Sequence, residues 1–363
     1  MGLPKVHVSF TEAAKTFVTR ADIGIVGLIL RDSIPAKNPV EIINTEDIPD
    51  TLTEANKKQL ELAIMGAERA PKKVVAYVIS PNEEGGEGEE PVVRDYQEAF
   101  DYFNGVTIDY LAVPDVLTDD RVNDVVTWVT TARADGRTVK AVLPNTASDN
   151  VGIINFATNS VVDDDITYSA AQYCARIAGM LASIPITESA TYKALYELTG
   201  CEKLSKAAMD EAIDAGKLIV FWDGEKVKIA RGVNSFQTTT ATMGAQFKKI
   251  RIIEIMDTIQ SDIKKLAEDY YIGRFSNSYA NKCILLSAIG DYLNELQNQQ
   301  VIRVINCDID EAANRKYLIS KGIDVSEMSD TDIREANTDD KVFLTATLSL
   351  YDAIEDIILP ITV

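Results

Sequence analysis

The sequence predicts a protein of mixed α/β and α+β class, in which an α/β domain with a largely parallel sheet precedes a C-terminal α+β domain. Three observations predict this. Between 23 and 143, apolar runs typical of buried strands alternate with helical patterns of about 10–15 residues, which favours parallel pairing. Two long amphipathic patterns follow between 244 and 299. Both ends of the chain carry strand-forming segments, which predict extended N- and C-terminal arms.

The first part of the chain repeats a simple unit, an apolar β-branched run followed by a helical pattern or a turn. An acidic, glycine-rich stretch at 82–90 interrupts this order and predicts a solvated loop, because it cannot bury itself. The predicted strands are 23–30, 40–43, 74–79, 107–113 and 138–143, and the predicted helices are 53–69, 92–103 and 118–136.

The second part is less regular and richer in helices. Asp223-Gly224 lies between the apolar segments 218–222 and 226–230, and this dipeptide is a strong signal for a β-hairpin. The other predicted strands are 153–162, 301–305 and 342–350, with further strand-forming residues at 357–363; the predicted helices are 168–183, 206–215, 244–271, 279–299 and 309–320, and 324–340 is expected to be loop and short helix.

Composition excludes several classes of function. The chain has 363 residues, with 36 Lys and Arg against 56 Asp and Glu and a net charge of −20. Such a surface argues against binding nucleic acid or an anionic membrane. One His excludes a metal site with two imidazoles, and the four Cys lack the C-x-x-C spacing, so they are expected to be free thiols in a reducing compartment. No signal peptide or membrane span is recognisable, which predicts a cytosolic chain.

No motif for catalysis or for a cofactor emerges, and we expect none of either. Phosphate-binding loops and nucleophile elbows are absent from the sequence, and Asp163-Asp164-Asp165 reads as a solvated turn, since the spaced pattern of a calcium loop is missing. The alternative is a cytosolic α/β enzyme or ligand-binding protein that uses the sheet of 23–143. Its site would lie at the carboxyl ends of the strands, near Ser80, Pro114 and Pro144.

One stretch reverses the sign of the overall charge. Between 226 and 253 there are six cationic residues and no anionic one. These cations either pair with carboxylates of the same chain or form a contact patch for an acidic partner. The helical pattern places three of them, Lys248, Lys249 and Arg251, in the first turns of a helix, where they oppose the helix dipole.

The chain ends are apolar and predicted to be strands. Because free termini usually fray, such tails are expected to dock on the parent domain or on a neighbouring molecule. The apolar residues that share one face or follow it are Val6, Val8 and Phe10 at the N-terminus, and Leu344, Ala346, Leu348, Leu350, Ile357 and Ile358 at the C-terminus.

Several segments, taken in order, resemble one known family. They are 19–32, the stretch 246–302 with its parts Lys248–Glu254, Tyr271–Lys282 and Tyr292–Val301, and 316–363. Together they are similar to contractile phage tail sheath proteins, above all to the small sheaths of clostridial and bacillar phages, defective prophages and bacteriocin-like particles. The resemblance implies an N-terminal arm at 1–20, an α/β domain at 21–185, a C-terminal sheath domain at 186–344 and a C-terminal arm at 345–363.

The resemblance also implies a function without an active site. A sheath subunit forms a helical homo-polymer of six-fold rings around a tail tube, assembled in the bacterial host cytoplasm, and contraction drives the tube through a cell envelope. Both arms add strands to neighbouring subunits, which assigns this role to the apolar end residues named above. The tube protein, the baseplate and the tail terminator are the other implied partners, and Lys248, Lys249 and Arg251 would face the tube. The sheath of a secretion or toxin-delivery device fits equally.

Overall fold

The computed structural model describes residues 24–82 and 95–362. Their contacts divide them into two compact units. The first, which we call the sheet unit, comprises 24–82, 95–258 and 352–362; the second, the ribbon unit, comprises 259–351. The chain passes between them within a helix at 258/259 and again at 351/352. The predicted domain boundary at 185/186 falls inside the sheet unit.

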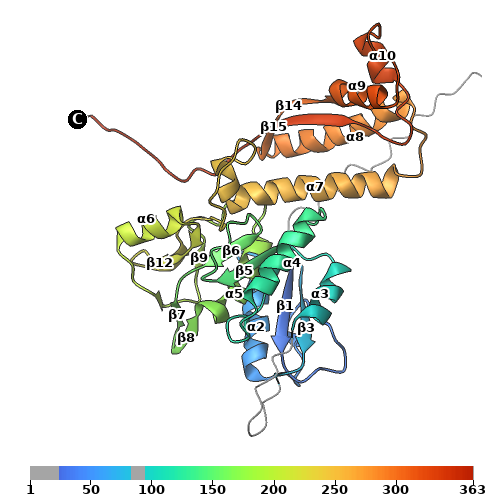
Figure 1. Ribbon diagram of the computed structural model, residues 1–363. Coiled ribbons are helices and arrows are strands. Elements are labelled where there is room, and N and C mark those ends of the chain that lie inside the picture. The colour runs from blue at the N-terminus through green and yellow to red at the C-terminus, as the bar shows by residue number, and fades with distance from the viewer. Residues whose placement is uncertain (1–23, 83–94, 363) are drawn as a thin grey trace, which may run out of the picture. The chain divides into compact units, whose positions relative to one another are not determined.

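The sheet unit is built on a sheet that has seven strands among the described residues (Figure 1). Each neighbouring pair is parallel except β2–β3 at one edge, which is antiparallel. The largely parallel sheet predicted from the sequence is therefore confirmed. In spatial order its strands are β11 Lys217–Leu218, β6 Ile153–Phe156, β5 Lys140–Pro144, β4 Tyr110–Ala112, β1 Ile25–Arg31, β3 Lys73–Ile79 and β2 Val40–Ile42.

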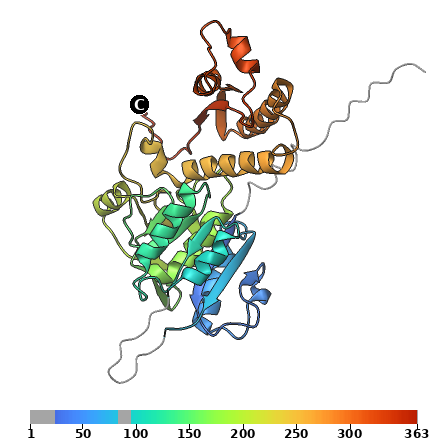
Figure 2. The same ribbon diagram turned by 45° about the vertical axis from the view of Figure 1, so that its right-hand side comes forward.

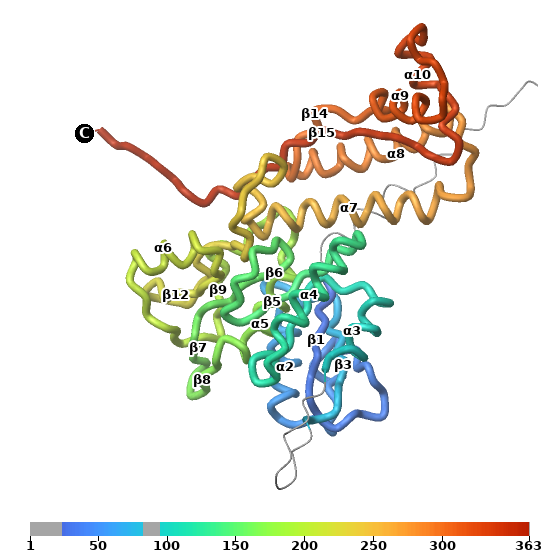
Figure 3. Tube along the Cα trace, viewed as in Figure 1, coloured from blue at the N-terminus to red at the C-terminus, as the bar shows by residue number. Residues whose placement is uncertain are grey.

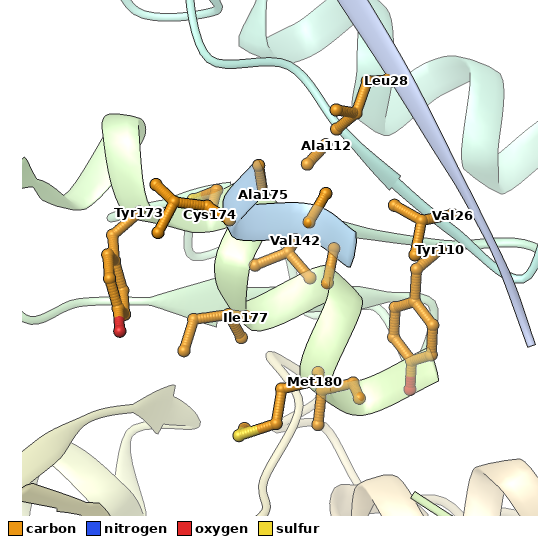
Figure 4. Close-up of a cluster of buried hydrophobic side chains, with 14 of the residues drawn as sticks. Val26, Leu28, Tyr110, Ala112, Val142, Tyr173, Cys174, Ala175, Ile177 and Met180 are labelled. Carbon is orange, nitrogen blue, oxygen red and sulfur yellow. The ribbon is translucent and has the colours of Figure 1, made fainter. Parts of the chain in front are cut away.

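Helices cover both faces of this sheet. The alternation along β1 separates two cores: Val26 and Leu28 lie in one cluster with residues of α2 and α5, whereas Ile29 lies in another with residues of α3 and α4. Figure 4 shows Cys174, Ile177 and Met180 of α5 among side chains of the first cluster. The helices are α2 Glu54–Met65, α3 Gln97–Asn104, α4 Val122–Ala134 and α5 Ala170–Ser183.

Two small sheets complete the sheet unit, and they correct one prediction. The strand expected at 153–162 is two strands, because the chain leaves the main sheet after β6 and enters a small sheet as β7. Asp164, at a φ of 48°, then turns the chain into β8, so the aspartate run is a turn as predicted. The predicted hairpin is confirmed as β12–β13. The strands are β7 Ser160–Asp163, β8 Ile166–Ser169 and β10 Gly200–Cys201 in one sheet, and β9 Ala194–Leu195, β12 Val220–Trp222 and β13 Val227–Ile229 in the other.

Helix α7 spans Ile250–Tyr270, so it begins six residues later than the predicted start at 244. A short 3-10 helix, η2 Ala245–Lys248, precedes it, and Lys249 is extended. The cause is pairing with an earlier segment: Lys249 bridges to Val233, and the Ile250 amide donates to the Gly232 carbonyl. Lys248 and Lys249 therefore precede the helix, and of the three cations only Arg251 lies in its first turn.

The ribbon unit packs helices around an antiparallel pair of strands. In both ribbon views the pair lies along α8 (Figures 1 and 2), and β14 contacts that helix. The predicted strand 301–305 continues further, to Ile309, and a bulge near Ile305 shifts its register with β15. The elements of the ribbon unit after α7 are α8 Tyr279–Asn298, β14 Ile302–Ile309, α9 Glu311–Ser320, α10 Asp330–Glu335 and β15 Leu344–Leu350. The remaining helix, α6 Lys206–Asp214, belongs to the sheet unit.

Gly179 on α5 lies at a close approach to α2. A Cβ at this position would lie 1.9 Å from the Ala63 carbonyl oxygen. We expect Gly179→Ala to lower the free energy of unfolding by about 1–3 kcal/mol or more, because the helices must move apart. Urea unfolding followed by circular dichroism measures the change.

The matched control is Gly290→Ala in α8, where no described neighbour lies within 4 Å of the added carbon. Its helix propensity should raise stability by about 0.5–1 kcal/mol. Equal stability of the two alanine variants would contradict close packing at Gly179.

Candidate functional site

The β14–β15 pair leaves two backbone edges open. Within the described residues each strand pairs only with the other, so the outer edge of each has no strand beside it. Most of its side chains are half-buried or exposed, and Ile305 in the bulge is 62% exposed. A two-stranded sheet is marginal by itself, and open edges readily pair with another chain. This ribbon can therefore accept further strands.

Four of the residues predicted for the C-terminal arm lie on this ribbon. Leu344, Leu348 and Leu350 are half-buried and Ala346 is exposed, all on β15, paired with β14 of the same chain. The predicted arm residues Val6, Val8 and Phe10 lie outside the described residues. Their role as an inter-subunit arm stays a prediction.

The residues after β15 form an extended tail, which we call the arm (352–362). It contains no helix or strand. Its extended trace is visible in Figure 3. Ile357 and Ile358, both predicted arm residues, are 82% and 91% exposed, and Leu359 and Ile361 are also exposed. Such a contiguous apolar segment in water is a typical mark of an interaction site. The arm has the chemistry of a strand without a partner.

The cationic stretch is bound largely within the sheet unit. The Lys249 ammonium pairs with Asp352 and Glu355, and Arg231 pairs with Asp356. Burial lowers the pKa of Lys249, but its bonds to the two carboxylates outweigh this and raise the pKa above its ordinary value. Lys228 likewise pairs with Asp223. Pairing with carboxylates of the same chain, one of the two readings of this stretch, is confirmed for these three cations.

The other two predicted tube-contact residues differ in exposure. Arg251 is 7% exposed, and its guanidinium donates to the carbonyls of Ile186 and Thr187. Burial lowers its pKa. The Lys248 ammonium is half-buried and donates to the Gln237 side chain at 3.1 Å. The structure thus places the three side chains in three different environments, and a buried Arg251 cannot form a surface patch with the others.

A second charged cluster fixes the start of α7 on the sheet. The Lys140 ammonium lies 3.2 Å from Glu254 and 3.1 Å from Asp257, and Arg133 bonds both oxygens of Asp257. Burial raises the pKa of Glu254, with Lys140 acting in the opposite sense. For Lys140 burial lowers the pKa, but the two acidic charges prevail and raise it. Sequence reasoning missed this cluster, because more than 100 positions separate its two cations from its two carboxylates.

The carboxyl ends of the parallel strands are closed by internal bonds. Buried Asp119 accepts hydrogen bonds from Arg31, Asn82 and Tyr96, and Arg31 also donates to the Ser80 carbonyl. Among the described residues there is no group of three or more His, Cys, Asp or Glu that could hold a metal ion. The four cysteines are free. The bonds of Asp119 and Arg31 stabilise the strand ends near which the enzyme alternative placed its site.

Comparison with known proteins decides the family. The model for the phage tail sheath protein central domain matches residues 90–235, and the model for the phage tail sheath C-terminal domain matches 242–363. A tail sheath protein of Clostridium phage phiCD119 is 37% identical over 98% of this chain and 98% of its own length. This chain belongs to the phage tail sheath family. Its expected role as a structural subunit of a contractile tail is confirmed.

More distant relatives agree with this membership. The PBSX protein XkdK of Bacillus subtilis is 24% identical over 50% of this chain and 40% of its own. The sheath tail protein Lin1278 of Listeria innocua has the same fold, with a TM-score of 0.69 at 18% identity over 83% of this chain and 93% of its own. The helical sheath of the anti-feeding prophage in its contracted state has the same fold, with a TM-score of 0.67 at 14% identity over 100% of this chain and 99% of its own. None of the described helices has the length and apolar character to cross a membrane.

Lys140→Met should reveal how much the buried cluster contributes. Removing the ammonium leaves the half-buried Glu254 without its cation and the buried Asp257 with Arg133 alone, and we expect the free energy of unfolding to fall by about 3–5 kcal/mol. Adding Glu254→Gln should recover part of the loss, since the amide carries no charge. Denaturant unfolding at neutral pH measures both.

The control is Lys73→Met, which breaks the partly exposed pair with Glu41. It should cost less than about 1 kcal/mol. If Lys140→Met were as mild as Lys73→Met, the cluster would not hold α7.

Proposed function

We propose that copies of this chain polymerise by strand addition, with the arm of one copy pairing along the β14–β15 ribbon of another. The observation that carries the proposal is the coexistence of a donor and an acceptor in one chain. The ribbon has open edges, and the arm is exposed, extended and apolar. Main-chain hydrogen bonds would hold the joint, and alternate side chains would fill pockets on the acceptor.

The arm's sequence suits an outer strand. Ile357, Leu359 and Ile361 alternate and would face the acceptor's apolar side together. Pro360 has no amide hydrogen, so it fits an edge position in which its nitrogen points away from the neighbouring strand. The proposed arm thus begins after β15, whereas Leu344–Leu350 belongs to the ribbon that receives strands. The N-terminal segment 1–20, with Val6, Val8 and Phe10, is proposed as a second donor.

Polymer geometry follows from this head-to-tail relation. A donor site and an acceptor site on different parts of one chain generate rings or open helices, and a rotation that does not close gives a helical tube. We propose six-fold rings stacked around a tail tube and bound to a baseplate and a tail terminator, assembled in the cytoplasm of a bacterial host. Among solved structures of the same fold are a contracted helical sheath and a baseplate of the anti-feeding prophage.

A contact with an acidic tube protein is proposed for Lys248. Its ammonium donates to the neutral Gln237 side chain, whereas Lys249 is engaged by two carboxylates and Arg251 is buried. Rim ion pairs contribute about 0–1 kcal/mol each, so such contacts would bind reversibly.

Two charges on the arm should prevent polymerisation. In Ile357→Asp/Ile358→Asp the exposed isoleucines become carboxylates that cannot be buried against an acceptor strand at low cost. We expect folded monomers, with the circular dichroism of the parent chain and no rods or rings in negative-stain micrographs or sedimentation velocity.

Ile34→Asp serves as the control, because Ile34 is also exposed, at 54%, but lies outside the arm and the ribbon. It should polymerise normally. Polymers of undiminished length from the arm variant would refute strand donation by these residues.

A further inference from the structure

The base of the arm is bound, although its end is free. The chain leaves the ribbon unit at Tyr351, whose amide still donates to the Val301 carbonyl. The next five residues, Asp352–Asp356, contain three carboxylates and belong to the sheet unit. Ile354, in the middle of this segment, is 87% exposed, so burial of this apolar side chain does not hold the segment in place. Its attachment is electrostatic.

The receiving surface is formed by three side chains from two distant stretches of the sheet unit. Glu355 accepts a 2.6 Å hydrogen bond from the Thr191 hydroxyl and a 2.9 Å bond from the Lys249 ammonium. Its carboxylate side chain is only 5% exposed. Lys249 also bonds Asp352. A carboxylate this buried within an otherwise exposed tail requires fixed, charged donors.

The three donors are held by bonds within the sheet unit that do not involve the acidic segment. The Thr191 hydroxyl accepts hydrogen bonds from the Gly232 amide and from the Ser189 hydroxyl. These two bonds orient the Thr191 hydroxyl so that its own hydrogen points at Glu355. Arg231 precedes Gly232 and donates to both oxygens of Asp356, at 2.8 and 2.9 Å. The pairing of Lys249 with Val233 fixes the third donor on the same backbone. One loop, 231–233, therefore organises all three donors.

The geometry points to a binding site for an acidic peptide segment, formed by Thr191, Arg231 and Lys249, whose occupant is this chain's own Asp352–Asp356. We call it the acidic-segment site. Occupation sets where the arm begins. With the segment bound, the free part of the arm begins at Ile357. With the segment released, it begins at Asp352, which adds five residues, about 17 Å of extended chain.

The inference rests on the proposed function, since the reach of the arm matters only if the arm is donated. It adds a regulatory step to that function, because binding and release of one short segment switch the arm between two lengths. A cavity of about 700 Å³ borders Arg231, Glu355 and Asp356, so solvent ions reach the pairs. Salt therefore weakens the bound state.

Proteolysis in the full-length chain tests the site. The experiment uses the Ile357→Asp/Ile358→Asp background, so that polymers do not hide the tail, and brief proteinase K digestion followed by intact-mass spectrometry locates the first cuts. With the site intact at 50 mM NaCl, cuts should fall after residue 356. With Arg231→Gln/Lys249→Gln, cuts within 352–356 should appear at least about tenfold faster, as expected for losing one charge-assisted hydrogen bond.

Two further variants separate release from misfolding. The control Lys57→Gln/Lys73→Gln removes two cations that pair with Glu54 and Glu41, which take no part in the acidic-segment site, and should leave the cuts unchanged. The exchange Arg231→Asp/Asp356→Arg should restore much of the protection lost in Arg231→Asp alone. Raising NaCl to 1 M should release the segment in the intact site.

The outcomes distinguish the two proposals. Equal cutting within 352–356 in the intact and Arg231→Gln/Lys249→Gln proteins, or no recovery in the exchange variant, would overturn the acidic-segment site alone. Polymers of undiminished length from the Ile357→Asp/Ile358→Asp protein would overturn strand donation by the arm, whatever the cleavage positions.

Discussion

The open strand edges of the β14–β15 ribbon are the constraint on which the proposed association of this protein depends. A strand edge in water is not costly, but it is a template, and proteins that remain monomeric usually cover or charge it. Here the ribbon has α8 on one side, few fully buried residues and a bulge that exposes Ile305. Its completion by strands from other copies would turn a marginal element into part of a larger sheet.

The sheet unit, by contrast, buries its main sheet among its own described residues. Its parallel sheet is covered on both faces, and its two apolar clusters include many side chains with no exposed surface. The charges of Lys140, Glu254 and Asp257 are paired inside it, which fixes the first half of α7.

Local patterns predicted most elements, and long-range contacts account for the differences. Val122, Val125, Val126 and Val129 recur at helical spacing and lie on α4, and Asp223-Gly224 lies in a hairpin. The delayed start of α7 could not be predicted, because it depends on pairing with Val233, sixteen residues earlier. The break between β6 and β7 has the same kind of cause, since the two strands pair in different sheets.

The candidate site was predicted in part, for a related reason. Isoleucines near a terminus and an alternating strand are local signals, and they marked Ile357, Ile358 and Leu344–Leu350 as strand-forming. The pairing of Leu344–Leu350 with β14 of the same chain was not predicted. The sequence also showed that the cations of 226–253 needed an acidic counterpart, but it could not choose between a partner and the chain itself. Asp352, Glu355 and Asp356 were visible as an acidic run after the last strand, yet more than 100 residues separate them from Lys249 and Arg231.

One short tail thus combines two kinds of interaction that respond differently to subunit movement and to salt. Main-chain pairing, as proposed for residues 357–363, depends little on side-chain identity and survives changes in the angle between subunits. Ion pairs of the kind seen at Asp352–Asp356 are individually weak, depend on position and yield to salt. Subunits that move while staying connected would need main-chain pairing at the joint between copies. They would need weaker ion pairs at the place where the free part of the arm becomes longer. The order of residues along the arm, acidic first and apolar after, meets both requirements.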